Sequence, residues 1–86
     1  MLEDKGDDIA AVAERLKAAR LALGMEKKEF AERADMGMQT YGPFENAKRP
    51  LSLEAAKKLR KAYGLPLEFM YFGKIDDLPH KIAAKL

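Results

Sequence analysis

Few side chains in this 86-residue sequence are of types that could catalyse a reaction. It has no cysteine and a single histidine, which excludes a thiol nucleophile, a disulfide scaffold and a cysteine-based zinc site. His80 follows Leu78-Pro79 with no serine-based triad nearby, and there is neither a glycine-rich phosphate loop nor a cluster of metal-ligating residues. We therefore predict no enzyme activity, no cofactor and no metal site, and interpret His80 as a surface or interface residue.

The charged side chains show a clearer pattern. The net charge is +2, but residues 1–8 carry four acids against one lysine, for −3, whereas residues 9–62 carry 12 Lys/Arg against 7 Asp/Glu, for +5. A basic body suits a polyanionic partner, although an ordinary solvated surface has the same composition. Lys27 and Lys28 fall in the first turn of an expected helix, where cations oppose the helix dipole. Either an external anion compensates their unfavourable interaction with the helix dipole, or the protein tolerates this small cost at its surface.

Residues 26–46 include Lys27 and Lys28 and must position them. This stretch is expected to form two short helices joined by a tight corner. Asp35-Met36-Gly37 breaks the first helix, since Asp and Gly tolerate left-handed backbone, and Met36 is expected to point inward. Tyr41, Phe44 and Glu45 should share the inward face of the second helix, and Met38, Gln39, Gly42, Pro43 and Asn46 the outward face. This describes either a helix-turn-helix, whose second helix enters the DNA major groove, or any other helical corner.

The dipeptide Gly42-Pro43 conflicts with a regular second helix. If that helix starts near Met38, Pro43 lies past its first turn, loses the bond to the Gln39 carbonyl and clashes with it, at a cost of roughly 3 kcal/mol. Gly42 adds up to about 1 kcal/mol relative to alanine. We therefore predict a helix that is kinked or begins afresh near Pro43.

Apolar residues three or four apart indicate the other helices. A first helix carries Ile9, Val12, Leu16, Ala19 and Leu23, with Asp7 or Asp8 as N-cap and Gly24 as C-cap. A fourth follows Ser52 and ends at Gly64, with Leu53, Ala56, Leu59 and Tyr63 facing inward. A fifth runs from Pro66 to Gly73, and a short last helix could begin at Pro79. With no strand pattern or internal repeat, the fold class is all-α: a compact five-helix domain with a short C-terminal helical extension.

The chain divides into an acidic flexible arm at 1–8, a helical domain at 9–73 and a C-terminal extension at 74–86. The end of the chain is rich in apolar residues, namely Phe69, Met70, Tyr71, Phe72, Ile75, Ile82 and Leu86. They exceed what a small domain should bury there, which predicts a dimerisation segment or a site for a protein partner. The alternative is a tail folded back on the first helix. Without cysteine, an apolar leader or a membrane-spanning run, we expect a soluble cytoplasmic protein.

Over residues 12–73 the sequence resembles the helix-turn-helix domain of Cro/C1-type phage repressors and their XRE-family relatives. The matching pieces are Arg15-Leu16-x3-Arg20-x3-Gly24-Met25, Glu29-Phe30-Ala31 and Tyr41-x2-Phe44-Glu45-Asn46-x-Lys48-Arg49-Pro50. The resemblance implies a lambda-repressor-like fold and a DNA-binding transcriptional regulator, a repressor, that acts on double-stranded DNA as a homodimer.

The resemblance also implies roles for individual residues. Arg20 and Glu45 would form a buried ion pair; the phosphate contacts would come from Lys27 or Lys28 and from Asn46, Lys48 and Arg49; and base edges would be reached by Met38, Gln39, Thr40 and Pro43. Gln39 could pair bidentately with adenine, whereas Met38 offers only apolar contact with a thymine methyl. The sequence departs from the family pattern at Glu26, Asp35, Gly37 and Gly42-Pro43. We therefore expect only weak sequence-specific recognition of DNA bases. The alternative is a helix-turn-helix scaffold used for protein interaction, with weak or no specific DNA binding.

Overall fold

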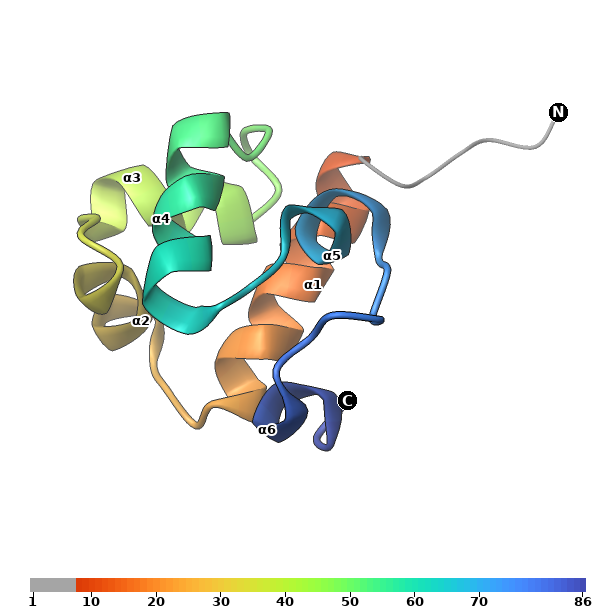
Figure 1. Cartoon of the computed structure of the whole chain (residues 1–86). Helices are drawn as coiled ribbons and strands as arrows, with labels where there is room; N and C mark the ends of the chain where they lie inside the picture. The colour runs from red at the N-terminus through yellow and green to blue at the C-terminus, as the bar shows by residue number, and fades with distance from the viewer. Residues whose placement is uncertain (1–7) are drawn as a thin grey trace, which may run out of the picture.

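The computed structural model describes residues 8–86, which form six α-helices and no strand (Figure 1). The helices are α1 (Ile9–Ala22), α2 (Lys27–Arg33), α3 (Met38–Glu45), α4 (Leu53–Tyr63), α5 (Leu67–Phe72) and α6 (His80–Ala83). The all-α prediction, five helices with a short helical extension, is confirmed. Residues 1–7 of the expected acidic arm lie outside the described residues. Asp8 is the N-cap of α1 and accepts a hydrogen bond from the Ala11 N–H.

The first three helices end in the same type of turn, which sets the direction in which the chain leaves each helix. A residue in the left-handed conformation follows each helix end, and the next N–H bonds back to the carbonyl five residues earlier. The left-handed residues are Gly24, Asp35 and Ala47 (φ 70°, 62° and 59°), and the closing bonds are Met25 to Arg20, Met36 to Ala31 and Lys48 to Pro43. Because only the first of these residues is a glycine, the other two turns carry backbone strain.

The corner between α2 and α3 agrees with the sequence at two of its three residues. Asp35 takes the left-handed backbone, and Met36 is buried. The same expectation for Gly37 is wrong, because its φ of −84° is extended and it serves as the N-cap of α3.

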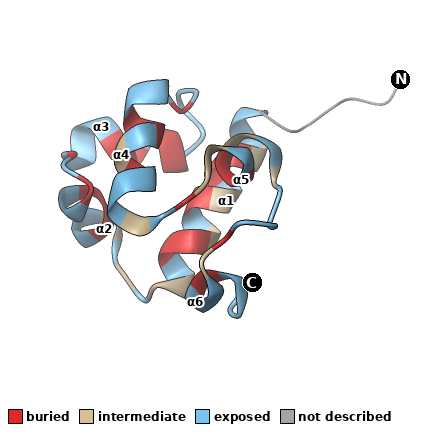
Figure 2. Cartoon of the chain, in the orientation of Figure 1, coloured by how far each residue is buried: buried red, intermediate tan, exposed pale blue. Residues whose placement is uncertain are grey.

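Aromatic rings join this corner to α4. The Phe30 ring stacks on Tyr63 with centroids 4.5 Å apart and meets Tyr41 at 5.4 Å. The Tyr63 hydroxyl donates to the Phe30 carbonyl at 2.7 Å. Figure 2 shows buried residues on the faces that the helices turn towards one another and exposed residues on the outer faces of α2 and α3.

The buried face of α4 differs from the predicted one. Ala56 and Leu59 are buried and Tyr63 is half-buried, as expected, but Leu53 is 54% exposed and Ala55 is buried in its place. At 100° per residue Leu53 lies about 60° from Ala56 and about 120° from Leu59 around the helix. It therefore sits at the edge of the apolar face rather than within it.

The C-terminal extension folds back on α1. α6 packs against α1, and Leu78 and Ile82 join the same core cluster as the first five helices. Phe69 and Met70 of α5 are also buried. The prediction that Phe69, Met70 and Ile82 form surplus apolar surface is therefore wrong, because the monomer covers them itself. Of the other four residues in that prediction, Tyr71 is half-buried, and Phe72, Ile75 and Leu86 are more than half exposed. Within residues 8–86, none of the helices has the length and apolar character needed to span a bilayer.

Arg15 ties α1 to the end of α5. Its Nη1 donates to the Met70 carbonyl at 3.2 Å, a favourable place for a cation because the helix dipole is negative there. A Cβ at Gly73 would lie only 3.1 Å from this guanidinium. Glycine at 73 therefore leaves room for the contact and also accepts the left-handed φ of 79°.

Pro43 lies inside a single helix. α3 runs from Met38 to Glu45 without interruption, so the restart near Pro43 is wrong, whereas the alternative of a kink at Pro43 stays a prediction. One reason is that Gly42 has no Cβ, which relieves the usual steric restriction on the residue before proline. A second is tertiary, because burial of the opposite face stabilises the helix. Gly42 is itself buried, but a Cβ there would meet only the Met38 Cε, at 3.8 Å, so the side chain of an outward-facing neighbour covers it.

Candidate nucleic-acid interface

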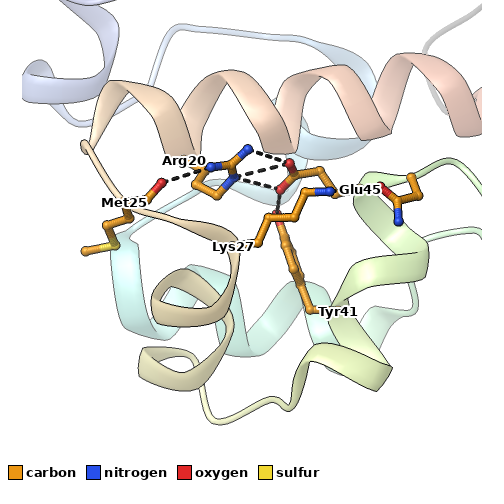
Figure 3. A network of polar contacts seen from close by, with 6 residues as sticks. Arg20, Met25, Lys27, Tyr41 and Glu45 are labelled. Carbon is orange, nitrogen blue, oxygen red and sulfur yellow. Dashed lines mark hydrogen bonds and ion pairs between the residues drawn. The ribbon is translucent and has the colours of Figure 1, made fainter.

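An ion pair between Arg20 and Glu45 fixes α3 against α1 (Figure 3). Arg20 Nη2 donates to Glu45 Oε1 at 2.8 Å, and Nε lies 3.0 Å from Oε2 and 3.2 Å from Oε1. The side chains are 10% and 1% exposed, respectively. The hydrogen bonds that Arg20 donates to Glu45 raise the pKa of Arg20 above its ordinary value; burial opposes this rise, and the Coulombic attraction to Glu45 adds to it. This is the pair that the family resemblance implied.

Two further groups complete the network around this pair. Arg20 Nη1 donates to the Met25 carbonyl at 2.9 Å, and the Tyr41 hydroxyl donates to Glu45 Oε2 at 2.7 Å (Figure 3). Burial, reinforced by the bond to Glu45, raises the pKa of Tyr41 far above its ordinary value. Tyr41 therefore remains a neutral donor. Through the Met25 carbonyl, the segment between α1 and α2 is held by the same ion pair that holds α3.

The start of α2 and the end of α3 meet at the surface. Lys27 Nζ donates to the Asn46 side-chain oxygen Oδ1 at 2.9 Å. Two residues expected to contact phosphate are therefore adjacent, although 19 positions separate them in the sequence. With its oxygen engaged by Lys27, the amide nitrogen of Asn46 is the part of that side chain left to donate outward.

Lys28 has a different environment from Lys27. It borders a surface hollow of about 500 Å³ whose other lining residues are Glu26, Glu29, Glu32 and Arg33. Three of these four neighbours are carboxylates, whose negative charge makes the local electrostatic potential less favourable for an approaching anion. Glu26 stands at the N-cap of α2 without forming a side-chain cap.

The segment between α3 and α4 presents Lys48 and Arg49, both exposed. Their backbone N–H groups donate to the Pro43 carbonyl at 2.8 and 3.2 Å. The segment therefore begins from a fixed point at the end of α3. It ends at Ser52, whose side chain caps α4 through the Ala55 N–H.

The front of α3 is exposed. Met38 is 38% exposed, Gln39 and Thr40 are exposed, and Pro43 is partly buried. Of these side chains, Gln39 offers both an amide donor and a carbonyl acceptor at its tip, and Met38 offers a flexible apolar end.

A family model described as "Helix-turn-helix" matches residues 16–70, which include all of α2, α3 and α4. The chain belongs to the Cro/C1-type helix-turn-helix family. The family consists of DNA-binding domains, not enzymes, and has the lambda-repressor-like fold. Neither a curated protein nor a solved structure matches the chain.

Two residues that support this helix-turn-helix domain were missed from sequence. Lys58 Nζ donates to the Asp35 carbonyl at 3.0 Å and so braces the corner between the two helices. The Tyr71 hydroxyl donates to the Leu51 carbonyl at 2.6 Å and braces the segment after α3. Their partners are 23 and 20 residues away, so no local spacing could have indicated either contact.

Proposed function

We propose that this helix-turn-helix domain is a transcriptional regulator that represses by occupying double-stranded DNA, with α3 in the major groove. Membership of a DNA-binding family supports the proposal. One observation favours the surface around α3 as the part of the domain that binds DNA. Lys27 at the start of α2 is bonded to Asn46 at the end of α3. The exposed front of α3 is therefore flanked by groups suited to phosphate, which is how a recognition helix is held in register on DNA.

The proposed base contacts come from Met38, Gln39, Thr40 and Pro43. Gln39 is suited to bidentate pairing with adenine N6 and N7, and Met38 to the thymine methyl. These preferences favour A·T base pairs. Pro43, in the middle of the face that would contact base edges, supplies no hydrogen-bond donor. This protein should therefore be less selective among DNA sequences than is usual for the family.

The proposed phosphate contacts come from Lys27, Asn46, Lys48 and Arg49. We favour Lys27 over Lys28 because Lys28 is bordered by carboxylates. Asn46 contributes a neutral hydrogen bond, so three cations per protomer would displace counterions.

We further propose that the domain acts as a homodimer in the cytoplasm. Two-fold symmetry would present two α3 helices to half-sites about one helical turn apart. Phe72 and Ile75, exposed by 56% and 62% at the end of α5, are the apolar residues best placed to contribute to such an interface.

The test is the salt dependence of DNA binding, measured by fluorescence anisotropy on a random duplex and on the native upstream region. Six cations per dimer predict a slope of about −5 for the logarithm of the binding constant against the logarithm of salt concentration. Arg49→Ala removes two of these contacts per dimer and should make the slope shallower by about 1.8.

Arg60→Ala is the matched control. It removes the same charge from the exposed face of α4, beside Glu68 and Asp77, and should leave the slope unchanged. An equal effect of both variants would mean that only the net charge matters.

A protein-interaction scaffold is the second candidate function. It is favoured by exposed apolar side chains, since Met38 at the front of α3 and Leu53 at the start of α4 are 38% and 54% exposed. Absence of binding to either duplex at low salt would support this reading against the first.

A further inference from the structure

The segment that carries Lys48 and Arg49 is anchored from a distant helix. At its beginning, the N–H groups of both residues bond to the Pro43 carbonyl. At its end, the Leu51 carbonyl accepts a 2.6 Å hydrogen bond from the Tyr71 hydroxyl of α5, and Leu51 is itself only 6% exposed. The segment is therefore held from both sides, and the second anchor belongs to a helix outside the helix-turn-helix.

We propose that Tyr71 is a positioning residue for DNA binding, which fixes the backbone at Leu51 and through it the placement of Arg49 and Lys48. This inference rests on the proposed function, and it assigns no DNA contact to Tyr71. Its effect would be transmitted through the chain between Leu51 and Arg49.

That chain is short and stiff. Pro50 is the single residue between Leu51 and Arg49, and its ring locks one of the two soft backbone dihedrals of that residue. Proline also confines the residue before it, Arg49, to extended backbone. A fixed Leu51 carbonyl therefore restricts the directions that the Arg49 side chain can take.

The Tyr71 hydroxyl is suited to a permanent anchor. Burial raises the pKa of this phenol above its ordinary value, so it stays protonated and able to donate at neutral pH. Binding orders flexible cationic side chains at an entropic cost, and a segment whose backbone is already fixed avoids part of it.

Tyr63 provides a matched control because it makes the same kind of bond elsewhere. Its hydroxyl donates to the Phe30 carbonyl at 2.7 Å, in a part-buried contact between α4 and α2, and burial raises its pKa in the same way. Tyr63→Phe and Tyr71→Phe each remove one hydroxyl of a half-buried side chain and one bond to a carbonyl. They differ in whether that carbonyl belongs to the segment carrying Lys48 and Arg49.

The experiment measures binding of the full chain to a random duplex over a salt series, at a temperature where circular dichroism shows each variant folded. Tyr71→Phe should weaken binding about three- to tenfold, and Tyr63→Phe less than about twofold. In a Lys48→Ala/Arg49→Ala background, adding Tyr71→Phe should change the affinity no further, because the groups that it positions are gone.

A second measurement needs no DNA. Amide hydrogen exchange at Lys48 and Arg49 should accelerate in Tyr71→Phe and remain unchanged in Tyr63→Phe, since only the first releases the segment. Unchanged exchange in Tyr71→Phe, equal loss of affinity in the two tyrosine variants, or an undiminished effect of Tyr71→Phe in the alanine background would each overturn the role of Tyr71. Failure of the parent to bind DNA would instead overturn the proposed function, and with it any role for Tyr71 in binding.

Discussion

Replacing Arg20 with alanine should remove a large share of the stability of the domain. The Glu45 side chain, 1% exposed, accepts three hydrogen bonds from Arg20 and one from the Tyr41 hydroxyl. In the variant only the Tyr41 bond remains on a carboxylate buried without its counter-ion. Stranding one partner of a buried pair costs about 3–5 kcal/mol. At about 0.05–0.15 kcal/mol per residue, an 86-residue domain has about 4–13 kcal/mol in total.

Urea unfolding followed by circular dichroism measures this loss. The matched control is Glu29→Ala, which breaks an ion pair with Arg33 whose partners are 45% and 63% exposed. An exposed pair one helical turn apart is worth about 0.2–0.5 kcal/mol. The double variant Arg20→Met/Glu45→Leu should retain more stability than Arg20→Ala, because no charge stays buried. If Arg20→Ala were as mild as Glu29→Ala, the pair would not hold α3 on α1 and the reasoning would fail.

Three further changes test the backbone and the core. Pro43→Gln should stabilise the domain by about 1 kcal/mol in urea unfolding, because residue 43 gains an N–H for the carbonyl four residues earlier; a less stable variant would show that proline is favourable here. Ala47→Gly should raise the melting temperature, since Ala47 has a φ of 59° that glycine adopts without strain, whereas Ala62→Gly within α4 should cost about 1 kcal/mol; changes of the same sign would refute this. Ile82→Ala should lower the free energy of unfolding by about 2–5 kcal/mol, because Ile82 is fully buried. Ile75→Ala, at an exposed site, should lower it by less than about 0.5 kcal/mol, and equal losses would place α6 outside the core.

The positions of the helices could be read from the sequence because their signals are local. Ser52 caps the start of α4, and Gly24, Gly64 and Gly73 adopt the left-handed backbone where helices end. Each of these effects involves residues within one or two turns of the chain. The Arg20–Glu45 pair came from a different source, the spacing shared with a known family, since a separation of 25 positions leaves no physical signal in a single sequence.

The sequence by itself therefore determined the all-α class, the order of the helices and the identity of the cationic residues, because periodicity, capping and charge are properties of neighbouring residues. Only the tertiary structure decided where the last helix lies, whether α3 survives its proline and which lysine stands beside Asn46. Ile82 becomes core because α1 covers it, and Pro43 is tolerated in a helix whose other face is buried. Both outcomes depend on surfaces brought together from distant parts of the chain, and hydrophobic burial acts on those surfaces wherever their residues stand in the sequence.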